Sequence, residues 1–417
     1  MSSAKHVTLD LTKLDFKFDS KLKGYLIAMI LIGIASLAIA FTAFGHVESR
    51  HLDVITAKPH HSNMGYNALL VATWFVIGIS ITGIFFTGVN HLTGAYWSVG
   101  VRRITEAYGL FAPVAGLLLI GVAFGLHDLY EWSHEGVPEH DELIGHKAGF
   151  LNAKFFYIRL ALFVTIWSVF GYLFYTLSKG QDSSKKPETT KTLAKLGGAF
   201  TILFALSFCF SAFDLIMSLT PHWYSTMFGV YQFAGAFQTG LVSYAIVILI
   251  LKSRGYYGDA INENHWHDIG KFLLGMTVFW AYTGFSQFML IWYAAIPEET
   301  FFYEQRLNGG WTFLTIALPI AKFIVPFLLL LNRPNKRDLK FLVGVGLWIV
   351  LWQFLEIYWH VFPANYENFS FAGLLLSLGA TIGTIGLFGF FVFSVLEKQK
   401  LIPVGDPRLE GSLSHHQ

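Results

Sequence analysis

The chain has 417 residues, of which 54% are hydrophobic and 17% aromatic, and only 13% carry a charge. Soluble domains usually carry a charge on about 25% of their residues, so this composition indicates an integral membrane protein and argues against an ordinary soluble enzyme. The net charge of +2 is close to neutral, and we find no Walker loop and no GxGxxG motif before a helix, so nothing in the sequence supports nucleotide or nucleic-acid binding.

Apolar segments follow one another along the whole chain. A transmembrane helix needs about 20 predominantly apolar residues. The predicted fold class is therefore an all-α integral membrane protein with about ten transmembrane helices. The predicted spans are 24–44, 66–90, 104–126, 155–179, 193–219, 228–252, 268–296, 309–331, 340–362 and 370–396.

One clear linker, SKGQDSSKKPETTK (178–191), lies near the middle of the chain and is rich in small, charged and helix-breaking residues. We expect helices 2–5 and helices 6–9 to form two four-helix bundles, with helices 1 and 10 at the periphery. The predicted divisions are a cytoplasmic N-terminal segment, helices 1–4 with an acidic and His-rich outer loop, helices 5–10, and a cytoplasmic tail. They cover residues 1–23, 24–192, 193–396 and 397–417.

The basic residues are divided unevenly between the two sets of loops. With ten helices, both termini lie on one side, and that side holds 22 of the 29 Lys and Arg residues, whereas the opposite loops hold five. The remaining two, Arg159 and Lys322, fall inside predicted spans. Because cytoplasmic loops are enriched in Lys and Arg, we expect both termini in the cytoplasm. The polar first 23 residues predict no cleavable signal peptide.

The sequence offers few ligands for a redox cofactor. The single cysteine, Cys209, lies in the fifth predicted span, which excludes an intrachain disulfide and an iron–sulfur cluster ligated by this chain alone. No pair of histidines lies at a matching central depth in two spans, so we expect neither a b-type haem nor a metal site. Redox chemistry would then require a bound quinol or partner subunits.

Asp214 is the most informative residue, because an ionisable side chain in lipid is costly and usually functional. It lies within CFSAFDLIMSLTPHWYSTMF (209–228), in the outer third of the fifth span. Loss of water would favour its protonated form and make it a candidate proton carrier, unless a nearby cation holds it ionised. A structural ion pair or hydrogen bond is an equally weighted alternative.

The eighth and ninth spans also carry charge. Glu356 and His360 share one face of the ninth span, in WQFLEIYWH (352–360), because their spacing is close to one helical turn. Lys322 lies near the middle of the eighth span between two prolines. Prolines free backbone carbonyls in a helix, and we expect these carbonyls to help hold the Lys322 ammonium.

These residues predict a single polar cluster in the outer half of the membrane, to which at least four helices contribute side chains. We expect this cluster to pass protons or to contact a quinol, with the quinol held by Asp128, Asp214 and His222. The alternative is that the histidines lie at helix ends without a chemical role and that Arg159 and Asp128 form a structural ion pair. The candidates are His127, Asp128, Arg159, Asp214, His222, Glu356 and His360, with Lys322 deeper in the membrane.

A smaller polar group is predicted on the cytoplasmic side, at the turn between the second and third spans. It includes His91 and Glu106 together with two arginines. We expect this group to be half solvated, and we consider His91 and Glu106 as candidates for a cytoplasmic half-path for protons. A polar group on each face, joined by Lys322, is the pattern expected of two proton half-paths.

The segments FDLIMSLTPHWYSTMFGVY (213–231) and GLHDLYEW (125–132), with the ten-helix layout, resemble the NrfD-like membrane anchors of polysulfide and nitrite reductases. More closely, the chain is similar to the membrane subunits of alternative complex III, a bacterial quinol:cytochrome c oxidoreductase, and among these to the ActF type. The resemblance covers nearly the whole chain. Asp214 and His222 match the family's motif, and His127 and Asp128 match its outer helix-3 end.

This resemblance implies a subunit of the bacterial inner membrane that takes part in respiratory electron transport without a redox cofactor of its own. The implied partners are an iron–sulfur subunit related to molybdopterin enzymes, a pentahaem and a monohaem cytochrome c, a sister NrfD-like membrane subunit, and lipids. Quinol, either menaquinol or ubiquinol, would be oxidised chiefly in the sister subunit, while both membrane subunits would carry proton half-paths.

Two other functions compete with this interpretation. A stand-alone secondary transporter would place Lys322 in a midplane site between inverted repeats, but the prolines around Lys322 have no counterparts in the first half of the chain. A purely structural anchor would hold Asp214 and Glu356 in dispensable ion pairs.

Overall fold

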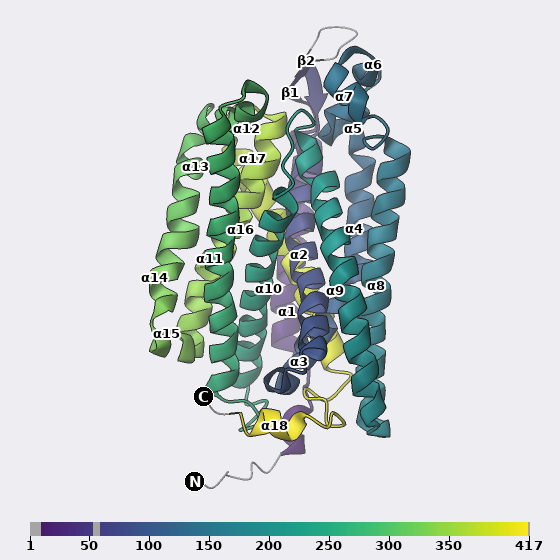
Figure 1. Ribbon diagram of the computed structural model, residues 1–417, viewed down its shortest axis with the longest axis vertical. Coiled ribbons are helices and arrows are strands. Elements are labelled where there is room, and N and C mark those ends of the chain that lie inside the picture. Colours follow the sequence, from purple (N-terminus) through teal and green to yellow (C-terminus); the bar gives the residue numbers. More distant parts are fainter. Residues whose placement is uncertain (1–9, 53–58, 416–417) are drawn as a thin grey trace.

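The structure, a computed structural model, describes residues 10–52 and 59–415. Within these ranges it is almost entirely helical, and ten helices are long and apolar enough to cross a membrane. The prediction of an all-α membrane protein with ten spans is therefore confirmed. The described part of the chain begins and ends at the same end of the helix array (Figure 1), as an even number of crossings requires.

Seven of the spans are single uninterrupted helices, and the other three are interrupted or extended by short turns. The third span combines α3 and α4, a 3₁₀ turn extends the fifth, and the eighth combines α13 and α14. The bounds are α1 (Ser20–Ala43), α2 (Met64–Leu92), α3 (Arg102–Gly109), α4 (Ala112–Phe124), α8 (Ala153–Ser184), α9 (Pro187–Leu215), α10 (Phe228–Ser253), α11 (Glu263–Ala294), α13 (Thr312–Pro319), α14 (Val325–Leu331), α16 (Leu339–Asn365) and α17 (Phe371–Leu396).

Short elements cap the two ends of the array (Figure 1). We call the end where the described residues begin and end the terminal end. The opposite end is the hairpin end, after the antiparallel pair β1 and β2. The remaining elements are β1 (Val47–Leu52), β2 (Pro59–Ser62), α5 (Leu126–Leu129), α6 (Val137–His140), α7 (Glu142–Lys147), α12 (Pro297–Leu307), α15 (Arg333–Arg337), α18 (Leu409–Leu413), and 3₁₀ turns at Leu11–Leu14, Tyr96–Gly100, Glu131–Ser133 and Met217–Leu219.

The spans pack as two groups. In the first bundle α2 contacts α3, α4 and α9, and α8 contacts α3, α4 and α9. In the second bundle α10 packs against α11 and α16, which both contact α14. Helix α10 also packs against α2 and α9, so it joins the two bundles. This grouping agrees with the expected bundles of helices 2–5 and 6–9.

Helices α1 and α17 form an extensive pair outside the two bundles, and α17 also packs along α2. Their backbones approach closely because glycines face each other: a Cβ on Gly33 would lie only 2.5 Å from the Cα of Gly383. Small residues that allow such approach are the usual basis of helix packing in lipid.

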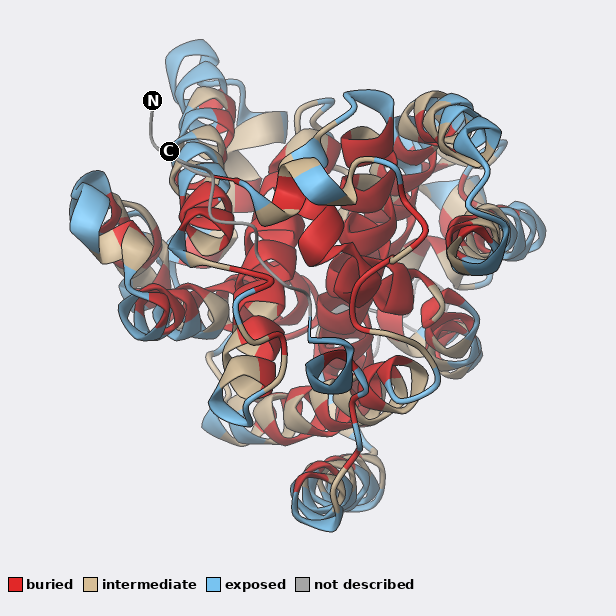
Figure 2. Ribbon diagram, turned by 90° about the horizontal axis from the view of Figure 1, so that it is seen from below, coloured by how far each residue is buried: buried red, intermediate tan, exposed pale blue. Residues whose placement is uncertain are grey.

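Buried residues concentrate in the middle of the array, and exposed residues lie on the outer helix faces (Figure 2). Many of the exposed side chains are large and apolar, such as Leu31 in α1, Leu117 in α4 and Phe285 in α11. An apolar exterior of this extent marks a surface that faces lipid.

The predicted linker 178–191 is much shorter than expected. Helix α8 continues to Ser184 and α9 starts at Pro187, which leaves only two residues between them. Lys185 takes a left-handed conformation with φ 52°, and Pro187 fits the first turn of α9, where no backbone N–H is needed. The polar composition of residues 178–191 predicted a loop, but α8 and α9 both continue beyond their apolar spans into this polar stretch.

The eighth span is not a regular helix. A π-helical turn, Ile320–Ile324, separates α13 from α14. Pro319 and Pro326 flank this turn, and each lacks the N–H that a regular helix uses. Single π turns often occur at functional sites, and this one contains Lys322.

Candidate functional site

A buried ion pair lies inside the second bundle. Lys322 is fully buried, and its ammonium contacts the carboxylate of Glu356 on α16. It also donates to Gln353 Oε1 at 2.6 Å and lies 4.4 Å from the ring centre of Trp280. The indole N–H of Trp280 donates to Glu356 at 2.8 Å.

The sequence-based expectation that backbone carbonyls hold Lys322 is corrected by this geometry. A side-chain carboxylate and an amide oxygen, both from α16, take that role. The i and i+3 spacing of Gln353 and Glu356 places both acceptors on one face of α16. Lys322, within the π turn, contacts both of them. An acid and a base are thus held together in the interior of a membrane-spanning bundle.

A cavity of about 750 Å³ lies beside this ion pair, bordered by α10, α11, α12, α13 and α16. Its wall is mostly apolar and aromatic, as is usual for ligand sites. On its outer side are exposed, lipid-facing residues of α11 and α13, including Phe285 and Ile316. Trp280 separates the cavity from the ion pair, because it lines the cavity and also binds Glu356.

His360 is at the inner wall of the cavity and is 3% exposed. Neither of its ring nitrogens has a hydrogen-bond partner. Its ring contacts are aromatic, edge-on to Phe228 at 5.3 Å and to Tyr231 at 5.7 Å between ring centres. Gln287, also at the wall, has an unpartnered side-chain oxygen. Buried polar groups without partners are rare and call for an explanation.

Asp214 does not join this site. Its carboxylate accepts two hydrogen bonds from the Arg159 guanidinium of α8, at 2.7 and 2.8 Å. The guanidinium carbon lies 3.8 Å from the ring centre of Phe150. The expected pairing of Arg159 with Asp128 is therefore wrong, because α8 and α9 are direct neighbours and bring Arg159 to Asp214.

The other residues of the expected outer cluster are also separated from one another. Asp128 accepts a hydrogen bond from the backbone N–H of Asn63, at 2.8 Å, just before α2. His127 shares a hydrogen bond with Ser133 at 3.1 Å. His222 donates to Asp141 at 2.7 Å. The expectation of one outer cluster is therefore corrected to a set of separate pairs.

The His222–Asp141 pair belongs to the loops of the hairpin end. Burial raises the pKa of Asp141, but hydrogen bonds from His222 and from the Ile144 backbone outweigh this effect and lower it overall. Asp141 also caps α7 by accepting from the Ile144 N–H at 3.0 Å. His222 and Asp214 thus bind different partners, Asp141 and Arg159 respectively.

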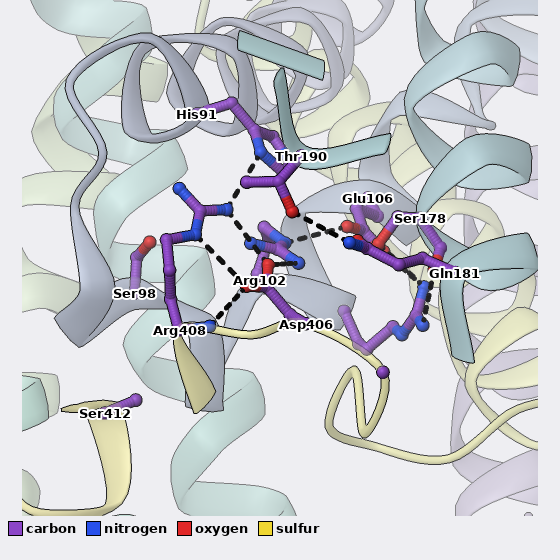
Figure 3. A network of polar contacts seen from close by, with 12 residues as sticks. His91, Ser98, Arg102, Glu106, Ser178, Gln181, Thr190, Asp406, Arg408 and Ser412 are labelled. Carbon is purple, nitrogen blue, oxygen red and sulfur yellow. Dashed lines mark hydrogen bonds and ion pairs between the residues drawn. The ribbon is translucent and has the colours of Figure 1, made fainter. Parts of the chain in front are cut away.

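At the terminal end, a dense group of charges is buried between the first bundle and residues 401–415, which we call the C-terminal segment (Figure 3). Glu106 accepts hydrogen bonds from Arg102 at 3.0 Å and from Arg103 at 2.8 Å. We call this group the terminal cluster. Its members are His91, Arg102, Arg103, Glu106, Asp182, Asp406 and Arg408.

The expectation that His91 and Glu106 are half solvated is wrong, since each is 1% exposed. The C-terminal segment covers them. Asp406 binds Arg102 at 2.8 Å and Arg408 at 2.9 Å, and Arg408 donates to His91 Nδ1 at 3.2 Å. His91 and Glu106 thus belong to one network but do not contact each other directly.

The charges around Asp406 determine its ionisation. Burial raises the pKa of this carboxyl, but the hydrogen bond from Arg408 and the positive charges of Arg102 and Arg408 outweigh it. The pKa of Asp406 is therefore held well below its usual range. An ionised Asp406 balances arginines that would otherwise repel one another.

The C-terminal segment also reaches the second bundle. His415 Nε2 donates to Asp268 of α11 at 2.8 Å. Next to the first bundle, Ser412 accepts from the Gly100 N–H at 3.0 Å. Sequence reasoning missed Asp406, Arg408 and His415. The segment GDPRLEGSLSHH has no apolar periodicity, so nothing in it indicated burial.

We expect Asp214→Asn to lower the stability of the folded protein by about 1–3 kcal/mol, the usual cost of weakening a buried charged hydrogen bond. The measurement is thermal unfolding of the detergent-solubilised protein. Asp141→Asn, at a partly exposed pair, is the control and should have a smaller effect. An unchanged melting temperature would show that the Arg159–Asp214 pair is not a structural support.

Metal and cofactor ligands are scarce in the described part of the chain. No group of three or more His, Cys, Asp or Glu side chains there is arranged to hold a metal ion. Cys209 is half-buried on α9. The Lys322–Glu356 pair joins an ammonium to a carboxylate, and the cavity beside it has a mostly apolar wall.

A scan against protein-family models and a search of curated proteins found no match to this chain.

Proposed function

We propose that this chain is a membrane subunit of a quinol-oxidising respiratory complex of the alternative complex III type, and that it contributes a proton path and assembly contacts. The observation that carries the proposal is the Lys322–Glu356 pair. Both side chains are buried within a lipid-crossing bundle, where charges are rare and usually functional. The resemblance of residues 213–231 to the NrfD-like family points the same way.

The chemistry of the pair suits proton transfer. An ammonium and a carboxylate in contact can exchange a proton when a charge near them changes, because the balance between the ionic and neutral forms is set by their surroundings. The π turn around Lys322 gives its backbone an irregular geometry that a small movement can alter. The terminal cluster supplies further titratable groups at the terminal end of the helix array.

The proposed setting follows from the resemblance and from the charge distribution. The complex lies in the bacterial inner membrane with both termini of this chain in the cytoplasm. Its partners are an iron–sulfur subunit, a pentahaem and a monohaem cytochrome c, and a sister membrane subunit. The lipid-facing surfaces of α1 and α11 leave ample area for such neighbours.

The test has two steps. The chain, affinity-purified from its native membranes, should bring c-type cytochromes and an iron–sulfur protein with it. The complex in liposomes should then reduce cytochrome when quinol is added and release protons.

We expect Glu356→Gln to lower proton release per electron by at least half. Asp214→Asn, at a separate ion pair, should leave that ratio unchanged. Purification of the chain without cytochromes would refute the proposal.

A secondary transporter is the second candidate, and one observation favours it. The broken eighth span lies beside a cavity, as in transporters with discontinuous helices. Substrate uptake by liposomes that contain the chain alone would support this function. The absence of uptake, together with co-purification of cytochromes, would exclude it.

A further inference from the structure

We propose that residues 403–415, the distal part of the C-terminal segment, form a charge-sensitive latch that closes the terminal end while His91 is neutral and releases when His91 takes up a proton. The inference goes beyond the proposed function and does not rest on it, because such a latch controls the access of water to the terminal cluster whatever partners the chain has. The bond between His91 and Arg408, the charge balance of the cluster and the attachment of the segment all support it.

His91 can hold the latch only in its neutral form. Arg408 donates to His91 Nδ1 at 3.2 Å (Figure 3). A guanidinium has donors but no acceptor, so Nδ1 must be the acceptor and must carry no proton. The proton of the neutral ring is then on Nε2, which is buried without a partner among the described residues. A second proton would have to occupy Nδ1, and it would remove the acceptor to which Arg408 binds.

The charges of the terminal cluster balance only while His91 is neutral. Asp406 binds both Arg102 and Arg408, and the charges of these three residues act on His91. A proton on His91 would add a buried cation beside two arginines without adding a carboxylate, and an uncompensated buried charge is strongly destabilising. The cations of the cluster are Arg102, Arg103 and Arg408, and its carboxylates are Glu106, Asp182 and Asp406.

The two parts of the C-terminal segment are attached in different ways. Leu401 and Ile402, just before the latch, are fully buried, and the Leu401 N–H donates to the Leu14 carbonyl at 3.0 Å. Within the latch, Leu409 and Leu413 are only partly buried, and charged and polar bonds make the main attachment. A change of charge can break such bonds but leaves buried apolar contacts intact. Release would therefore move the latch while Leu401 and Ile402 stay in place.

Release would also hydrate polar atoms that the closed state leaves without partners. Buried polar atoms without hydrogen bonds destabilise the state that contains them, and water would satisfy them once the latch opens. The closed state is therefore less stable than its ion pairs alone suggest. Among the described residues, the atoms of this kind in or beside the terminal cluster and the latch are His91 Nε2, Arg103 Nε, Gln181 Oε1 and His415 Nδ1.

The closed latch connects the two bundles. The Gly405 N–H donates to Asp182 of α8 at 3.2 Å, and His415 donates to Asp268 of α11 at 2.8 Å. Release would remove this connection between α8 and α11 at the same time as it opens the terminal cluster to water. A single proton would thus change both the solvation and the packing of the terminal end.

The test is amide hydrogen exchange, followed by mass spectrometry at pH 7, of the full chain in the assembly purified from its membranes. Exchange of residues 403–415 reports how often the latch opens. His91→Asn keeps a neutral acceptor in the place of Nδ1 and should leave the rate unchanged. His91→Leu removes the acceptor and should raise the rate about tenfold, the value of one hydrogen bond to a charged group. His91→Lys also adds a positive charge and should raise it further.

Two glycines of the latch give a matched pair that leaves the charges unchanged. A Cβ on Gly405 would lie 2.0 Å from the Gln181 carbonyl oxygen, so Gly405→Ala must push the latch away from α8 and should raise exchange. A Cβ on Gly411 would meet the Tyr96 ring at 3.3 Å, a side chain that can adjust. Gly411→Ala should therefore leave the rate unchanged, and the amides of α2 should stay protected in all variants.

A double variant separates repulsion from a general loss of packing. Arg408→Gln removes one of the cations that a lysine at position 91 would repel, so adding His91→Lys to it should raise exchange much less than His91→Lys does alone. Fully independent effects of the two substitutions would overturn the inference. Equal rates in His91→Asn and His91→Leu would also overturn it, and this comparison remains if His91→Lys fails to fold. Slow exchange in a folded Gly405→Ala protein would show that the latch does not release.

Discussion

Lys322→Met is expected to destabilise the protein by about 3–5 kcal/mol, the usual cost of removing one partner from a buried ion pair. The substitution leaves the Glu356 carboxylate buried, with Trp280 as its remaining donor among the contacts described above. Methionine has nearly the volume of lysine, so the loss would come from charge and not from a cavity. The measurement is thermal unfolding of the purified protein in detergent.

The double variant Lys322→Met with Glu356→Leu is the control. It removes both charges and replaces them with apolar side chains of similar size. Such replacements are often neutral or stabilising. We therefore expect the double variant to recover most of the stability but not proton release. If it is as unstable as the single variant, the pair is required for packing and the interpretation based on charge is wrong.

Ending the chain after Lys400 is the second change with a large expected effect. The deletion removes Asp406 from the terminal cluster and exposes the apolar surface covered by Leu401 and Ile402, which are fully buried. Each such side chain contributes about 1.5–3 kcal/mol when buried. We expect a strong loss of stability and proteolysis at the terminal end, measured by melting temperature and by limited digestion.

The point variant Asp406→Asn separates the charge from the rest of the deletion. Because the pKa of Asp406 is lowered in the folded protein, its ionised form adds stability above the unfolded pKa of about 3.9, and this stability is lost as pH falls through the folded pKa. We expect the variant to melt below the natural protein at pH 7 and the difference to shrink below about pH 4. A difference independent of pH would contradict an electrostatic role.

The residues that were expected to form one outer cluster lie apart in the structure, and this changes which of them are candidates for the functional site. Asp214 carries the family-like motif, yet it is held by Arg159 in the first bundle. The ionisable pair next to a cavity lies in the second bundle, on residues that no motif marked. The motif carries only a resemblance, whereas the geometry directs the functional hypothesis to Lys322, Glu356 and His360.

The sequence by itself determined the ten spans, because about 20 apolar residues in a row must cross the bilayer as a helix. It also determined which residues are exceptional, since Asp214, Lys322 and Glu356 carry charge inside those spans. Glu356 and His360 were placed on one helix face by spacing alone, and the structure shows Glu356 on that face bound to Lys322.

Only the tertiary structure decided which partners these residues have. Successive residues of a helix point about 100° apart, so pairing depends on the rotation and depth of each neighbouring helix, which hydropathy does not specify. That is why Arg159 meets Asp214 and not Asp128. The cavity beside His360 and the burial of the C-terminal segment arise in the same way, from surfaces of several helices that are far apart in the sequence.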